Sequence, residues 1–266
     1  MQPLRPRIGL LLVAAFSAAT ALLGQTRDCA AQDWVDGKVA GPFVCRAEFS
    51  LAGSENLLRE LIQIQVDVIR YLGLPAANEQ IEVYLFRDKR SYSGYIEKHL
   101  PKVPYRRALF IKGQGPGRVY AYQSRELAVD LRHECTHALL HAVLPVVPLW
   151  LDEGLAEYFE VPADQRAFGN PHLAPLRWNL RLGAKPKLTD LESKGGLSEM
   201  GGTEYRYAWA WVHFMLHGPP EAHQELVQFL AALQARTPPG LLSQRLNHRL
   251  SDAEQRLVAH FKGWKR

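Results

Sequence analysis

The chain has 266 residues, of which 47% are hydrophobic and 22% charged, and its formal net charge is +5. This composition suffices for one buried core and excludes a disordered or fibrous chain. Three cysteines are too few for a disulfide scaffold. Because no stripe of Lys and Arg interleaved with aromatic residues is present, we expect no nucleic-acid partner.

The first predicted element is an export signal. Arg5 and Arg7 precede an apolar run, residues 8–23, that is rich in Ala and Leu. This pattern is typical of a secretory signal peptide. We therefore expect residues 1–31 to contain a signal peptide that is cut between positions 24 and 31, and the protein to be secreted or periplasmic. The run is also long enough for an uncleaved N-terminal anchor, which would be its membrane contact.

Residues 33–266 are expected to form a single catalytic domain. If cleavage leaves Cys29 in place, this residue could pair with Cys45 in an oxidising compartment. The sequence does not define an oligomeric state.

The first half of this domain alternates between strand and helix patterns. A strongly amphipathic run at 55–72 predicts a helix that ends before Gly73. The other expected elements are an extended segment at 39–49, a buried strand at 81–86 and a short helix at 90–100.

Two further strands are expected at 107–112 and 118–123, with the Gly-rich segment 113–117 between them. That segment is not a phosphate-binding loop, because no helix N-terminus and no Gly-Lys-Ser sequence follows it. It favours a hairpin connection.

The next element, at 126–143, carries the most informative motif of the chain. Its apolar residues keep a helical period, and within it His133 and His137 flank Glu134 in an H-E-x-x-H sequence. Histidines four apart share one helix face, roughly 6 Å apart along the axis. Both rings can therefore bind one zinc ion, while the glutamate stands beside the open position where water is activated.

Two neighbours on this helix are expected to have other roles. His141 lies roughly 12 Å from His133 along the axis, too far to bind the same ion. We expect it to be structural or to support a ligand. Cys135 faces away from the histidines and is expected to be a small core residue instead of a nucleophile.

The segment that follows resembles a known superfamily. Trp150-Leu151-Asp152-Glu153-Gly154-Leu155-Ala156, after H-E-x-x-H, is similar to the W-L-x-E-G-x-A segment of gluzincin zinc peptidases, which include thermolysin and the zinc aminopeptidases. The resemblance implies that Glu153 is the third zinc ligand. It also implies that Glu157 hydrogen-bonds a ligand histidine, which would fix the orientation of that ring.

The resemblance extends to a helix expected at 204–217 and to a strand edge. By resemblance, the Tyr205 hydroxyl would stabilise the oxyanion, with Tyr207 as the alternative. The strand at 119–123 would hold the substrate backbone by β-augmentation. Between these lies a Gly- and Pro-rich stretch, 162–202, with short helical pieces, and two more helices are expected at 221–236 and 251–262.

The fold expected from these elements is α+β and gluzincin-like: a small mixed sheet with the H-E-x-x-H helix, followed by a mostly helical C-terminal half. The chain resembles small secreted bacterial proteins of the peptidase-MA-like kind. The resemblance implies a zinc metallopeptidase with one Zn²⁺, acting on a peptide or protein.

Three alternatives concern the activity itself. No segment like G-x-M-E-N, which in the aminopeptidases captures a free amino terminus, is present, and this favours an endopeptidase. The chain could instead be a degenerate zinc-binding module without turnover, although an intact Glu134 argues against that. It could also hydrolyse a non-peptide amide or ester, such as a cell-wall component.

Overall fold

The computed structural model describes residues 33–265. The expected signal segment and Cys29 lie outside these residues. Among the residues described, no helix is both long and apolar enough to span a membrane.

Among residues 33–265, five strands form one mixed sheet in the order β1-β2-β3-β5-β4. They are β1 (Asp36–Ala40), β2 (Phe43–Ala47), β3 (Ile81–Phe86), β4 (Ala108–Ile111) and β5 (Arg118–Tyr122). The two outer pairs, β1 with β2 and β4 with β5, are antiparallel, whereas β2, β3 and β5 run parallel. The extended segment expected at 39–49 includes the end of β1, a turn in which Gly41 adopts a positive φ of 59°, and all of β2.

The sheet order corrects one expectation. β5 pairs with β3 on one side and with β4 on the other, so its backbone is not free to take up a substrate strand. The edge strand on this side is β4, which in the described part of the chain pairs with β5 alone.

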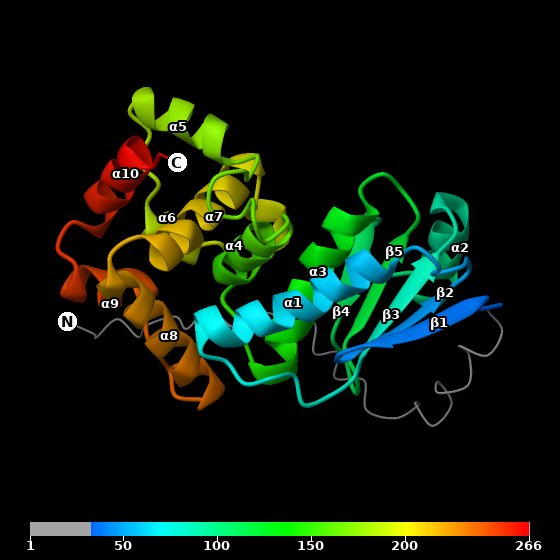
Figure 1. The fold of residues 1–266 in the computed structure, drawn as a ribbon. Helices are drawn as coiled ribbons and strands as arrows, with labels where there is room; N and C mark the ends of the chain where they lie inside the picture. The colour runs from blue at the N-terminus through cyan, green and yellow to red at the C-terminus, as the bar shows by residue number, and fades with distance from the viewer. Residues whose placement is uncertain (1–32, 266) are drawn as a thin grey trace.

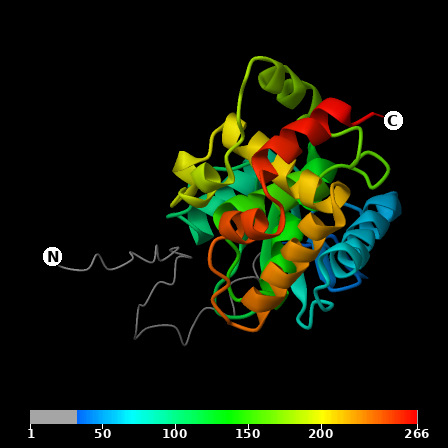
Figure 2. The ribbon, with the colours of Figure 1, turned by 90° about the vertical axis from the view of Figure 1, so that its left-hand side faces the viewer.

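Helices cover both faces of the sheet and form the rest of the molecule (Figure 1). The helices are α1 (Glu55–Leu72), α2 (Lys89–His99), α3 (Leu127–Val143), α4 (Leu149–Phe159), α5 (Leu173–Arg181), α6 (Leu188–Glu192), the 3-10 helix η2 (Leu197–Glu199), α7 (Gly202–His217), α8 (Pro220–Gln234), α9 (Leu242–Arg249) and α10 (Ala253–Gly263). Figure 1 shows α1 and α3 on one face of the sheet, α2 on the other, and α4 to α10 gathered beside them. In Figure 2, seen from this helical side, the orange and red C-terminal helices lie in front.

The described residues form two apolar cores. The larger one joins the α1 and α3 face of the sheet to α4, α7 and the C-terminal helices, and Cys135 is fully buried in it, as expected. The smaller one, between the sheet and α2, is built mainly from aromatic residues such as Tyr84, Phe86 and Tyr92. An α+β fold with a small mixed sheet and a mostly helical remainder is therefore confirmed.

Candidate metal centre

The candidate centre lies between α3 and α4, and buried contacts fix both helices. Trp150 and Leu151 at the start of α4 are 1% and 0% exposed, so this helix is anchored in the larger core. On α3, the buried Arg132 donates to the backbone oxygen of Glu160 and to the Glu60 carboxylate of α1. The two helices are thus held side by side, and the polar face of α3 is turned toward α4.

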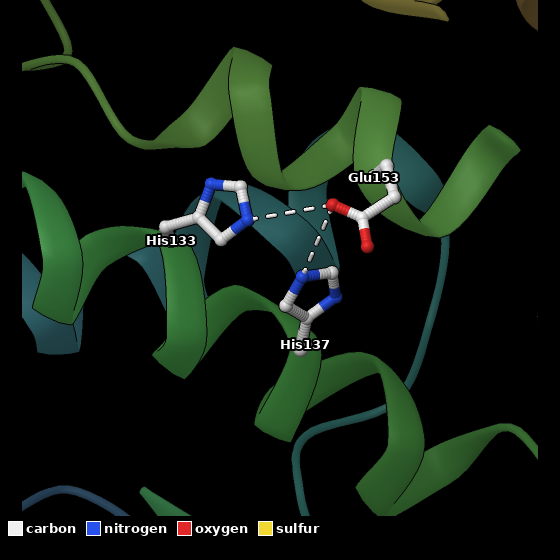
Figure 3. A group of neighbouring side chains, drawn as sticks. All are labelled: His133, His137 and Glu153. Carbon is white, nitrogen blue, oxygen red and sulfur yellow. Dashed lines mark ion pairs between the residues drawn. The ribbon is translucent and has the colours of Figure 1, made fainter. Parts of the chain in front are cut away.

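Three side chains from these helices point at one another (Figure 3). Oε2 of Glu153 lies 3.6 Å from Nε2 of His133 and 3.8 Å from Nε2 of His137. One donor atom from each residue lies within 4.8 Å of the other two. A tetrahedral zinc ion with bonds of about 2.1 Å separates its ligands by about 3.4 Å, so the distances from Glu153 to both rings are near those that one zinc ion requires.

The other ring nitrogens are held by carboxylates. Nδ1 of His133 lies 3.0 Å from Oε2 of Glu160, and Nδ1 of His137 lies 2.8 Å from Oδ1 of Asp152. Because a carboxylate only accepts, each Nδ1 carries the hydrogen, which leaves the Nε2 lone pair free to face Glu153. These hydrogen bonds therefore select the ring form that a metal needs.

Asp152 also reaches a third histidine. Its Oδ2 lies 2.8 Å from Nε2 of His141, one turn beyond His137 on α3. His141 thus supports the centre through Asp152 and does not face Glu153, in agreement with the role expected from helix geometry. Phe110 of β4 lies over the rings of His137 and His141, with ring centroids 6.4 and 5.5 Å away, and so forms an apolar wall of the site.

The structure places Glu157 differently from the sequence expectation. Oε2 of Glu157 lies 2.8 Å from Nε2 of His172, in the segment before α5. The hydrogen bonds to the two α3 histidines come from Asp152 and Glu160 instead. Sequence reasoning missed both, although Asp152 precedes the predicted ligand and Glu160 lies seven residues after it, at the C-terminal end of α4.

The electrostatics of the site favour positive charge at the two rings. Burial lowers the pKa of His133 and His137, but the nearby carboxylates outweigh this effect. The pKa of His133 lies well above its ordinary value because of Glu153 and Glu160, and Asp152 helps to raise that of His137 to about 9. A divalent cation bound here would supply the positive charge that these carboxylates stabilise.

Gly154 allows α7 to pack close to α4 beside the candidate centre. A Cβ at Gly154 would lie 2.7 Å from the backbone oxygen of Ala208, so only glycine permits this approach of α4 to α7. The close packing carries Tyr205, near the start of α7, to the candidate centre. Burial and the charge of Glu153 raise the pKa of Tyr205, so its hydroxyl keeps its hydrogen at neutral pH.

A cleft of about 330 Å³ opens beside the three candidate ligands. Its lining includes Glu134, Glu153, Tyr205 and Arg106. The structure thus brings together His133, Glu134, His137, Glu153 and Tyr205, as the sequence predicted, whereas Tyr207 is not among the residues of the described chain that line this cleft.

No protein-family model and no curated protein matches the chain. Among solved structures, it resembles an M1 zinc metallopeptidase from Deinococcus radiodurans, with 15% identity and a TM-score of 0.47 over 86% of this chain and 50% of that one. A mutant of the same enzyme gives 16% identity and a TM-score of 0.46, over 88% and 52%. The chain spans about half the length of these structures, and TM-scores below 0.5 do not establish a shared activity.

Proposed function

We propose that this protein is a zinc-dependent hydrolase that cleaves peptide bonds, with one zinc ion held by His133, His137 and Glu153. The observation that carries this proposal is the convergence of two Nε2 atoms and one carboxylate oxygen from α3 and α4, within 3.6 and 3.8 Å. Beside them Glu134 lines the cleft, and a purely structural zinc site would not need it. Zinc at this centre would supply a Lewis acid and lower the pKa of water.

The residues of the chain supply the remaining chemistry. Glu134 lines the cleft beside the three ligands, where it can accept a proton from the attacking water and deliver it to the leaving nitrogen. Tyr205 lines the same cleft and can donate its hydroxyl hydrogen to the oxyanion that develops on the substrate carbonyl. Asp152 and Glu160 hold the two rings in place throughout.

The sheet offers a place for the substrate backbone. β4 is the edge strand next to α3, and its Phe110 faces the rings of His137 and His141. We propose that an extended peptide adds to β4, which would lay its scissile bond across the candidate centre. An extended segment bound in this way need not end at the cleft, which supports an endopeptidase.

We also propose that the protein is exported. The support for this proposal is the signal-peptide pattern of residues 8–23 alone.

The proposal is tested first by metal content. The purified protein should contain one zinc ion per chain, and the H137N and E153Q variants should lose it, because each removes one of three ligands. The Glu134→Gln variant should still bind zinc, but its rate of cleavage of a peptide pool should fall by roughly 10²- to 10⁴-fold, since only the proton acceptor is removed.

A matched control is E97Q, which neutralises an exposed glutamate of α2. This variant should keep both zinc and activity. A metal-free wild-type protein, or full turnover in the E134Q variant, would overturn the proposal. Zinc binding without turnover of any peptide would identify the degenerate module, or a hydrolase of another amide or ester.

A further inference from the structure

Two neighbouring arginines at the entrance to β4 line the cleft, but only one is neutralised. Arg107 forms a bidentate ion pair with Asp130 of α3, with nitrogen–oxygen distances of 2.6 to 2.8 Å. Within residues 33–265, no carboxylate lies within 4 Å of the exposed Arg106 guanidinium. Arg106 therefore lines the cleft without an ion-pair partner among these residues.

Of the five carboxylates of the described residues that line the same cleft, Asp130 is paired with Arg107, three others face histidines, and the fifth is Glu134. Glu157 is hydrogen-bonded to His172 and Glu160 to His133, while Glu153 faces His133 and His137. None of these is paired with Arg106. The exposed Arg106 guanidinium is therefore available to a group from outside the described residues.

The Arg106 guanidinium lies beside the Tyr205 hydroxyl. Arg106 interacts with the Tyr205 hydroxyl through a side-chain hydrogen bond, in which the guanidinium donates and the hydroxyl oxygen accepts. The hydroxyl hydrogen of Tyr205 is then free to point into the cleft. Since a guanidinium has five N–H donors, several remain for a ligand.

Carboxylate is the chemistry that such a site recognises best. A planar guanidinium with free donors binds a carboxylate through two parallel, charge-assisted hydrogen bonds. We propose that Arg106 binds a carboxylate of the substrate, so that the cleft selects peptides with a negative charge near the scissile bond. This inference rests on the proposed peptidase function and names its substrate class.

The carboxylate has two possible sources, the free C-terminus of a peptide and an Asp or Glu side chain. The probes are pools of short acetylated peptides in matched forms: a free C-terminal acid with Asn, a C-terminal amide with Asn, and a C-terminal amide with Asp. Binding is measured on immobilised, zinc-loaded E134Q protein by mass spectrometry of the retained peptides. Retention of the first pool alone identifies the C-terminus, and retention of the third identifies an acidic side chain.

The decisive comparison adds a second substitution. E134Q/R106Q should lose about tenfold or more of the preference for charged pools, since a charge-assisted pair is removed. E134Q/R106K should recover part of it, because the charge remains but the planar fork is lost. E134Q/R90Q is the matched control, since Arg90 is an exposed arginine of α2 outside the cleft, and this variant should keep the full preference.

Equal retention of charged and neutral pools, no retention of any pool, or an unchanged preference in E134Q/R106Q would each overturn the inference. Turnover of the same pools by otherwise unmodified protein separates it from the proposed function. Selective binding that depends on Arg106, without cleavage of any pool, would support the inference about Arg106 and contradict the proposed peptidase activity.

Discussion

Oδ1 of Asp152 lies 2.8 Å from Nδ1 of His137. The next residue in the chain, Glu153, faces Nε2 of the same ring. One turn of α4 thus supplies both a candidate ligand and the group that orients a second ligand. Burial raises the pKa of Asp152, but the charges and hydrogen bonds of His137 and His141 outweigh this effect and hold the pKa well below its usual range. Asp152 is therefore ionised at neutral pH and able to accept both hydrogen bonds.

Replacing Asp152 by Asn should weaken zinc binding by about 10- to 100-fold, because a neutral amide orients the His137 ring less firmly and makes it less basic. Titration against a chromogenic chelator measures this directly. Asp190→Asn, at an exposed position of α6, is the control and should bind zinc like the unmodified protein. Equal zinc affinity of D152N and D190N would show that Asp152 does not support the centre.

Replacing Tyr205 by Phe should lower kcat by roughly 10²-fold with little change in KM, because only a donor to the developing oxyanion is lost. Tyr207→Phe should be nearly silent, since Tyr207 does not line the cleft. Steady-state kinetics on one peptide decides between the two tyrosines that the sequence left open. A loss confined to Y207F would reverse the assignment.

Gly154→Ala should lower the free energy of unfolding by about 1–3 kcal/mol, because its Cβ would collide with backbone atoms of Ala208 at 2.7 and 2.8 Å. The affinity for zinc should also fall, since a shift of α4 at position 154 would displace the preceding residue, the candidate ligand Glu153. Gly94→Ala, in α2, is the matched control. No atom lies within 4 Å of a Cβ there, and this variant should be equally stable or up to about 1 kcal/mol more stable. Urea denaturation of both compares them, and equal stabilities would contradict the packing argument.

Stability should fall on acidification because of His213 in α7. Its Nε2 donates to the Ala167 oxygen, so its Nδ1 accepts from Nε2 of His260, 3.2 Å away. Burial, with the nearby charges of His217, His260 and Arg177, lowers the pKa of His213 from 6.5 to about 3. Between these two pH values the unfolded chain binds a proton that the folded chain does not, so stability decreases as pH falls below 6.5.

Urea denaturation at pH 7.5 and pH 5 measures this slope. His213→Gln keeps a donor for the Ala167 oxygen but cannot take up a proton, and its stability should change less between the two pH values. His260, whose pKa burial lowers to about 4, leaves a residual slope. His248→Gln, at an exposed position, should keep the full slope. An unchanged slope in H213Q would exclude His213 as its source.

The sequence by itself determined the features that depend on local periodicity. Residues 55–72 and 81–86 were expected as a helix and a strand and are α1 and β3 with those bounds, and the helix expected at 126–143 is α3, Leu127–Val143. Amphipathic spacing and helix-ending residues act within one segment and can be read along the chain. The shared face of His133 and His137 follows from the helix period in the same way.

Only the tertiary structure decided which groups meet across segments. Asp152 and Glu160 hold the two rings while Glu157 turns to His172, because the rotation of α4 about its axis is set by the packing of Trp150 and Gly154. Strand order made β4 the edge instead of β5, and it brought Arg106 beside Tyr205. These relationships depend on contacts distant in sequence, whose geometry is fixed when the apolar surfaces are buried together.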